Sequence, residues 1–265
     1  MDKTSGIGVI LGFAVLIGGM ILKGSSPIAL YNPAALVIIM GGTVACILVA
    51  FPMDEVKKVP TLFKVVFSDL KMVPVKDMIP MFTEWAMIAR KEGLLSLEER
   101  SEEVEDPFLK RGLKMVVDGQ SQEQIRELME EEISAMEERH ELGAKIFTQA
   151  GTYSPTLGVL GAVIGLVAAL GHLDDVALLG KSISAAFIAT LFGIFMGYVL
   201  WHPFANKLKR KSEQEVRMKM IMLEGLLSVQ SGLPARVVEE KLLTYLPSKD
   251  RELKEPDRVG AQIEA

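Results

Sequence analysis

Two apolar stretches in the second half of the chain carry the residues that could take part in ion movement. One covers residues 151–170 and the other 184–203, and neither contains aspartate, glutamate, lysine or arginine. Each has about the 20 residues that cross the hydrocarbon core of a bilayer. Thr190 places a hydroxyl roughly 10 Å from the outer end of its stretch, at about 1.5 Å per helical residue. A simple anchor needs only aliphatic side chains, so we interpret the pair as the working part of an ion-conducting membrane protein.

No predicted span contains a carboxylate, although a proton or sodium path normally needs an ionisable group at membrane depth. The chain also has no phosphate loop, nucleotide fingerprint, nucleophile elbow or metal-ligand pair. We therefore expect no catalytic site, no metal and no cofactor. If the chain moves ions, the carboxylate must come from another subunit, which predicts an obligate membrane partner.

The two stretches are expected to be antiparallel neighbours, because a short link joins them. Ala162 on the first then lies at a depth similar to that of Thr190 on the second, and in an oligomer both positions could face one lumen. The alternative for Thr190 is structural. Its hydroxyl would donate to a backbone carbonyl one turn earlier in the helix.

Two further apolar runs, residues 6–22 and 33–51, complete four predicted spans. The first is not typical of a cleaved signal peptide, because Asp2 and Lys3 cancel in the leader and Pro27 occupies the cleavage region. Positive charge follows spans two and four and is scarce in the two short links. The positive-inside rule therefore places both termini and the charged middle block in the cytoplasm.

Composition agrees with a chain whose charged and apolar residues are segregated. Of its 265 residues, 49 % are apolar and 24 % charged, and the net charge of −5 argues against a nucleic-acid binder. We predict an all-α, four-span membrane protein with an inserted helical cytoplasmic domain. The expected segments are 1–53 (spans one and two), 54–148 (cytoplasmic domain), 149–204 (spans three and four) and 205–265 (C-terminal cytoplasmic helices and a polar tail).

Helix-capping patterns divide the charged block. Asp106 before Pro107 predicts a helix start, and capping-box spacings begin at Ser96 and Ser121. The helix that starts near Ser121 is expected to continue into the third span, where Pro155 either kinks it or starts it afresh.

Several stretches resemble the MotA/PomA subunit of the bacterial flagellar stator. The resemblance covers nearly the whole chain and is strongest to proton-type members from Gram-positive bacteria. The resemblance rests on residues 153–166, 190–193 and 203–212 in and after the last two spans, and on residues 90–98 in the charged block.

The resemblance implies a ring of five copies around two copies of a single-span B subunit (MotB-type) in the inner membrane. That B subunit carries the membrane aspartate and a peptidoglycan-binding domain. Proton passage would step the ring around the B dimer, and the cytoplasmic domain would turn the rotor protein FliG.

The resemblance also suggests roles for single residues. Arg90 and Glu98 match a charged pair that engages the rotor, and Glu99 belongs with them. The alternative is that both charges interact with helix ends. Pro155 and Pro203 match two prolines that couple ion flow to movement, and the alternative is that they are ordinary helix-boundary prolines.

The coupling ion can be argued from oxygen ligands. Sodium-type relatives have threonine at the positions of Ala162 and Ala189, beside the threonine kept here as Thr190. Sodium needs several oxygen ligands, whereas a proton needs a carboxylate and a water path. Two methyl groups in place of two hydroxyls therefore favour proton coupling.

Two other functions remain open from the sequence. An ExbB/TolQ-like energiser would use the same ion machinery, but such proteins have three spans and lack the charged signature at residues 90–98. A passive membrane scaffold would show no dependence on Thr190 or Pro155.

Overall fold

The computed structural model describes residues 3–69 and 73–248, and no strand occurs in these ranges. The polar tail expected at the C-terminus lies outside the described residues beyond position 248. In the first 69 residues the helices are α1 (Lys3–Leu22), the 3₁₀ turn η1 (Pro27–Leu30), α2 (Pro33–Leu36), the π-helical turn η2 (Val37–Gly41), α3 (Gly42–Ala50), α4 (Met53–Val56) and α5 (Val59–Phe67). The remainder are α6 (Val75–Glu92), the 3₁₀ turn η3 (Leu94–Leu97), α7 (Glu98–Glu103), α8 (Pro107–Val117), α9 (Gln122–Leu170), α10 (Val176–Phe195), the π-helical turn η4 (Met196–Trp201), α11 (His202–Gln230) and α12 (Ala235–Leu243).

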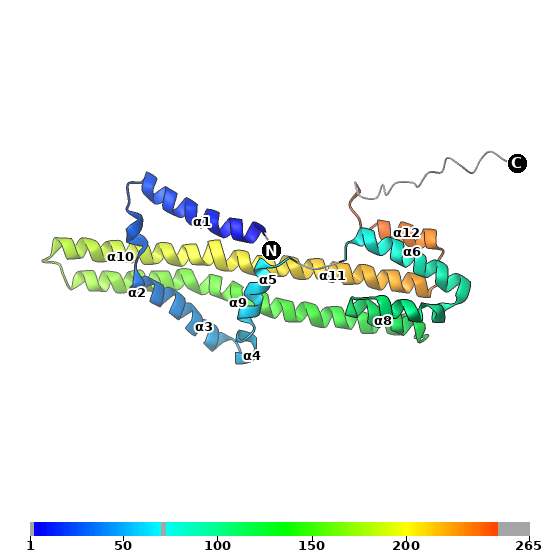
Figure 1. The fold of residues 1–265 in the computed structure, drawn as a ribbon. Helices are drawn as coiled ribbons and strands as arrows, with labels where there is room; N and C mark the ends of the chain where they lie inside the picture. Colours follow the sequence, from blue (N-terminus) through cyan, green and yellow to red (C-terminus); the bar gives the residue numbers. More distant parts are fainter. Residues whose placement is uncertain (1–2, 70–72, 249–265) are drawn as a thin grey trace, which may run out of the picture. The chain divides into compact units, whose positions relative to one another are not determined.

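Four helical segments are long and apolar enough to cross a membrane, as the sequence predicted. They are Lys3–Leu22, Pro27–Ala50, Gln122–Leu170 and Val176–Gln230. The last two are much longer than a bilayer needs, since their apolar parts continue into polar helix (Figure 1).

The described residues form two compact units, each built from two stretches of chain. The first unit comprises Met1–Leu70 and Glu138–Ser212, and the second comprises Lys71–Glu137 and Glu213–Ala265. The segments expected from the sequence were single stretches. The difference arises because α9 and α11 each contribute residues to both units.

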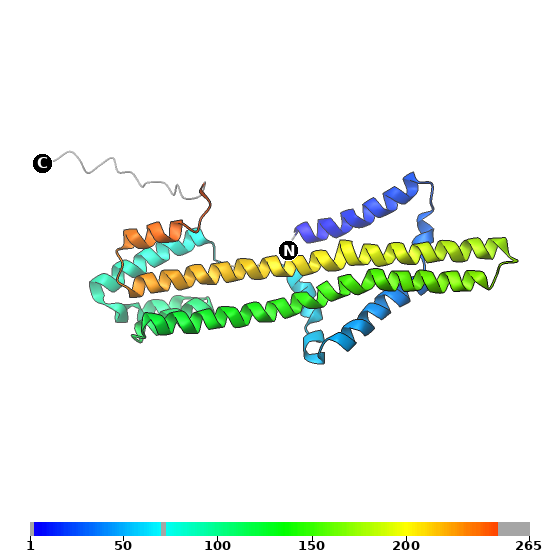
Figure 2. The same cartoon turned by 180° about the vertical axis from the view of Figure 1, so that it is seen from behind.

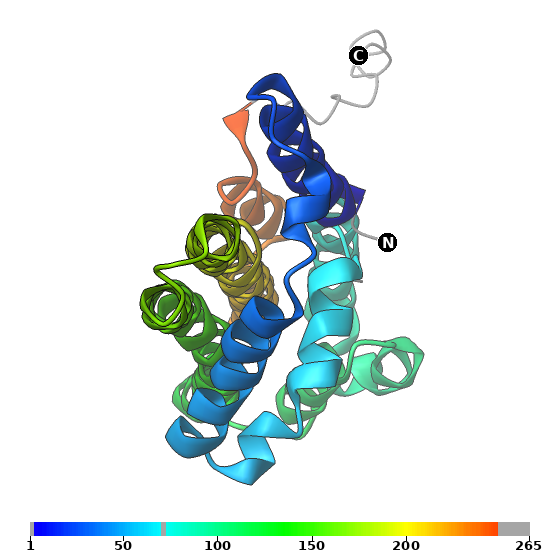
Figure 3. The ribbon, with the colours of Figure 1, turned by 90° about the vertical axis from the view of Figure 1, so that its left-hand side faces the viewer.

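The first unit is centred on α9 and α10, which lie side by side (Figure 3). Helix α1 packs against η4, where a Cβ placed on Gly12 would lie 2.7 Å from Val199. Helix α3 packs against α9, where a Cβ on Gly42 would lie 2.9 Å from Leu157. The first two spans therefore flank the central pair (Figure 2).

The short amphipathic helix α5 closes the polar end of this unit. Phe63 packs edge-to-face on Phe147 with ring centroids 5.0 Å apart, and Trp201 and Phe204 join the same aromatic cluster. The C-terminal carbonyls of α5 accept hydrogen bonds from the buried ammonium of Lys211 on α11. A cation at this end of a helix also interacts favourably with the helix dipole.

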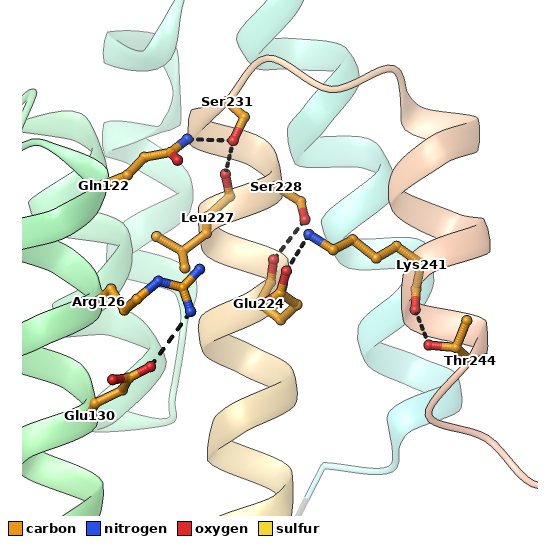
Figure 4. Close-up of polar contacts among 9 residues, drawn as sticks. All are labelled: Gln122, Arg126, Glu130, Glu224, Leu227, Ser228, Ser231, Lys241 and Thr244. Carbon is orange, nitrogen blue, oxygen red and sulfur yellow. Dashed lines mark hydrogen bonds and ion pairs between the residues drawn. The ribbon is translucent and has the colours of Figure 1, made fainter.

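The second unit has its own apolar core. Phe82 and Trp85 of α6, Leu113 of α8, Ile125 of α9 and Leu226 of α11 are all at most 3 % exposed. Polar contacts close one end of it (Figure 4). There Lys241 of α12 forms an ion pair with Glu224 of α11, and Gln122 of α9 donates to Ser231.

Two of the three predicted helix starts are confirmed. Asp106 accepts a hydrogen bond from the backbone N–H of Leu109 at 2.9 Å. Ser121 and Gln124 form the predicted reciprocal capping box. The capping box at Ser96 is wrong: its hydroxyl donates to the carbonyl of Gly93 instead, because a 3₁₀ turn occupies residues 94–97 and α7 begins two residues later.

Candidate functional site

Small residues line the seam between α9 and α10 and bring the two backbones close together. A Cβ placed on Gly193 would lie 2.6 Å from the carbonyl oxygen of Ser154 and 2.8 Å from the Cα of Gly158. A Cβ on Gly165 would lie 3.1 Å from the Cβ of Ala186. Such close approach stabilises helix pairs where lipid surrounds them and the hydrophobic effect gives no net attraction.

Of the predicted ion-path residues, Ala189 lies at this seam and is buried, whereas Ala162 is half-buried. Ala189 is 2 % exposed, and a Cβ on Gly161 of α9 would lie 3.1 Å from its methyl group. Ala189 also borders a cavity of about 230 Å³ between α2 and the seam. Ala162 is half-buried one residue beyond Gly161 and does not line this cavity.

Thr190 is half-buried, and its hydroxyl donates to the carbonyl of Ala186 at 3.4 Å. This is the bond of the structural alternative. A hydroxyl with this long bond still has its acceptor lone pairs for a water or an ion. The geometry of a single subunit is therefore compatible with both interpretations of this residue.

The two prolines occupy different environments. Pro155 lies inside α9, which continues through it for 49 residues in all, so the helix does not start afresh there. A Cβ on Gly197 of η4 would lie 2.8 Å from the Cγ of Pro155. Pro203 is exposed in the first turn of α11, and it lines a cavity of about 440 Å³ with Thr4, Tyr198 and other residues.

A buried hydroxyl pair beside Pro155 was not predicted. The Thr43 and Ser154 side chains are 4 % and 0 % exposed, and their oxygens lie 3.1 Å apart. Each hydroxyl also bonds a carbonyl one turn earlier, of Ile39 and Ala150 respectively. The sequence signal was weak, because serine and threonine are common in apolar helices and periodicity does not show which two helices meet.

The predicted rotor-interacting residues lie on the surface of the second unit. Arg90 is in the last turn of α6, and Glu98 and Glu99 form the first turn of α7. All three are exposed, and none has a side-chain hydrogen bond or ion pair with the rest of the described chain. Their charges are therefore available to a partner.

The neighbouring acidic residues are already engaged. Glu102 pairs with Lys110 at 2.8 Å and Lys114 at 2.7 Å, and hydrogen bonds from these two lysines lower the pKa of its carboxyl from 4.5 to about 2. Glu103 pairs with Arg100 at 3.0 Å, which raises the pKa of that guanidinium. Among the acidic residues of α7, only Glu98 and Glu99 remain unpaired within the described residues.

Family models match almost all of this architecture. Residues 6–93 match the Motility protein A N-terminal model, and residues 100–220 match the MotA/TolQ/ExbB proton channel family. Motility protein A of Bacillus subtilis (strain 168) is 63 % identical over 251 residues, covering 95 % of this chain and 93 % of that protein. The chain belongs to the Motility protein A family.

Solved structures of that family have the same fold. The flagellar MotAB stator complex from Bacillus subtilis contains a chain that is 62 % identical and superposes with a TM-score of 0.90, over 94 % of this chain and 98 % of its own. A chain of C. jejuni MotAB is 34 % identical with the same TM-score of 0.90, over 96 % and 100 %. The resemblance seen in the sequence is thus confirmed, and this Motility protein A relative is a membrane protein and a flagellar stator subunit.

The N-terminal match separates the family from its ExbB and TolQ relatives. The channel model alone is shared by all three groups, whereas the Motility protein A model covers the first two spans and the chain as far as Gly93. The matched families are channel and motor components and none is an enzyme family.

Proposed function

We propose that this chain is the torque-transmitting A subunit of a proton-driven flagellar stator in the bacterial inner membrane. Five copies surround two copies of a single-span, MotB-type B subunit, with both termini in the cytoplasm. A relative in a solved MotAB stator complex, 62 % identical to this chain, supports a B-type partner and an oligomer. The four spans satisfy the even topology, and the apolar parts of these four segments carry no carboxylate for an ion, so the partner supplies its membrane aspartate.

The observation that carries the torque assignment is the surface of the second unit. Arg90, Glu98 and Glu99 are exposed charges of both signs on α6 and α7 that form no ion pair within the described residues, while the next two carboxylates are held by basic residues. Exposed charges that form no internal ion pair can pair with complementary charges on a rotor protein such as FliG. Such pairing gives orientation and fast association more than tight binding.

Proton coupling is supported by the oxygen atoms near the seam. Ala189 is buried against α9 and offers only a methyl group, and Ala162 adds no oxygen either. Thr190 is then the one side-chain oxygen among these three positions. A single hydroxyl is a poor cage for sodium, but it can bond a water in a proton path.

The experiment separates torque from ion flow. In cells whose only stator is this chain with its B subunit, Arg90→Ala/Glu98→Ala is expected to reduce motor torque severalfold while proton flux through the purified complex is unchanged. The matched control is Arg126→Ala/Glu130→Ala, which removes an exposed ion pair of 3.5 Å from the same unit. If the control loses as much torque, or the first variant loses none, the rotor assignment fails.

A further inference from the structure

Gly197 packs against Pro155, the first of the two prolines predicted to couple ion flow to movement, and precedes the second, Pro203, in the chain. It lies in η4, the π-helical turn that directly precedes His202 and Pro203. A Cβ placed on it would lie 2.8 Å from the Cγ of Pro155 and 2.8 Å from the carbonyl oxygen of Gly151. Only a residue without a side chain fits between these two groups.

The carbonyl of Gly151 lacks its usual α-helical hydrogen-bond donor because residue 155 is proline. In an α-helix it would accept a hydrogen bond from the N–H of residue 155, and proline has no N–H. The Cα of Gly197 approaches this carbonyl from the neighbouring helix. Contacts of a Cα–H group with a carbonyl oxygen recur where helices pack this closely.

Gly197 is linked to the second proline through its own carbonyl. The N–H of His202, the residue before Pro203, donates to the carbonyl of Gly197, five residues earlier. This is the wider hydrogen bond of a π-helix, and such turns occur frequently at functional sites. Pro203 itself cannot donate to residue 199, so the wide turn accommodates the missing α-helical bond.

The start of α3, directly after the π-helical turn η2, meets the same part of α9. Gly42 directly follows η2, and a Cβ on it would lie 2.9 Å from Leu157. Thr43, the next residue, contacts the Ser154 hydroxyl at 3.1 Å. The turn of α9 around Pro155 is therefore held between η4 and the start of α3.

We propose that Gly197 is a positioning residue of the ion-driven step, which transmits movement between the turn at Pro155 and the turn at Pro203. The inference rests on the proposed stator function. A change in the α9 turn must displace Gly197, because no free space separates them, and the His202–Gly197 bond carries that displacement to Pro203. The exchange of π-type and α-type hydrogen bonds in η4 provides the two arrangements.

The test compares Gly197→Ala with Gly193→Ala in complexes with the B subunit. Both variants force a Cβ to within 2.8 Å of α9 backbone, but the nearest atoms at position 193 belong to Ser154 and Gly158, whereas position 197 meets the Pro155 ring itself. Gly18→Ala, where nothing lies within 4 Å, is the control for the substitution itself. Motor torque and proton flux are measured for each, together with the amount of assembled complex, and torque per transported proton is the readout.

Gly197→Ala is expected to lower torque per proton about tenfold, within the coupling range of residues in direct contact. Gly193→Ala is expected to reduce the amount of assembled complex and to leave the torque per proton of the complexes that do assemble unchanged. The proposal would be overturned if Gly197→Ala had the same torque per proton as wild type. It would also be overturned if Gly197→Ala and Gly193→Ala lost torque per proton equally. A wild-type complex without flux or torque would instead refute the proposed function.

A second measurement applies even if Gly197→Ala does not assemble. Pro155→Ala, Pro203→Ala and the double variant are compared for torque per proton. If the prolines act through one link, the double variant is no worse than the poorer single variant. Losses that multiply would mean that the prolines act independently, and the proposal would be wrong.

Discussion

At the scale of single residues, close packing between α9 and α10 limits which side chains can replace Ala189. Ala189 is a position where sodium-type relatives were expected to carry threonine, yet here it is 2 % exposed against Gly161. A threonine would add two heavy atoms to a contact that is already tight. A change of coupling ion therefore needs movement of α9 as well as new oxygen atoms.

Ala189→Thr is accordingly expected to destabilise the assembled complex by about 1–3 kcal/mol, the usual range for overpacking. Ala162→Thr, at the neighbouring half-buried position, is expected to have a smaller effect. Thermal denaturation of the two purified complexes measures the difference. Equal stability of both variants would show that the seam relaxes more easily than its geometry indicates.

Glu102 gives a prediction with a defined pH window. Its folded-state pKa is lowered to about 2 by Lys110 and Lys114, so its contribution to stability is fully present above its ordinary pKa of 4.5. That contribution is lost as the pH falls from 4.5 towards 2. Glu102→Gln should therefore speed hydrogen exchange in α7 and α8 modestly at neutral pH, and the difference from wild type should vanish near pH 2.

Glu105→Gln is the matched control, since Glu105 is exposed and forms no ion pair within the described residues. It should leave exchange in α7 and α8 at the wild-type rate throughout this range. If the exchange rates of Glu102→Gln and wild type still differ by the same amount at pH 2, the effect of the substitution does not come from the charge of Glu102.

At the scale of helices, α5 depends on a cation from a distant part of the chain. Lys211 is 6 % exposed and donates to the carbonyls of Val65, Val66 and Ser68, which end that helix. Carbonyls at a helix end have no partner within the helix, and leaving them buried and unsatisfied is unfavourable.

Lys211→Met keeps the length and apolar stem of the side chain but removes its donors. It is expected to lower the stability of the first unit by about 1–3 kcal/mol, the usual result of leaving a buried group unsatisfied. Lys209→Met, two residues away and exposed, is the control. Similar thermal stability of the two variants would contradict the proposed support of α5.

Helix boundaries were largely predictable because they follow local chemistry. Asp106 and Ser121 cap the helices that their spacing predicted, and charge-free runs marked the four spans. The π-helical turns were not predictable, since a wide turn depends on what the neighbouring span presents. The burial of Lys211 was not predictable either, because it depends on where α5 packs.

The site residues were chosen from family resemblance, and their roles stay predictions. Burial and contacts explain why sequence alone could not rank them. Glu98 and Glu102 look equivalent in the sequence, but the second is engaged by two lysines that lie eight and twelve residues further along. The place of Gly197 against Pro155 follows only from packing.

At the scale of the whole molecule, the topology predicts which surfaces face the cytoplasm. In a Cys46→Ser background, Ser25→Cys lies in the first short link and Glu123→Cys in the charged block, and both side chains are exposed. A membrane-impermeant thiol reagent should label the first in intact cells and the second only after permeabilisation. Equal labelling of both in intact cells would invert or break the four-span arrangement.

The central claim is that this chain and a B subunit turn proton flow into rotation. The most direct measurement is the speed of single motors whose only stator contains this chain, at fixed membrane potential and pH gradient, while sodium concentration is varied. The account predicts rotation at a speed that does not change with sodium. Motors that stay still with an assembled stator, or a speed that rises with sodium, would contradict it.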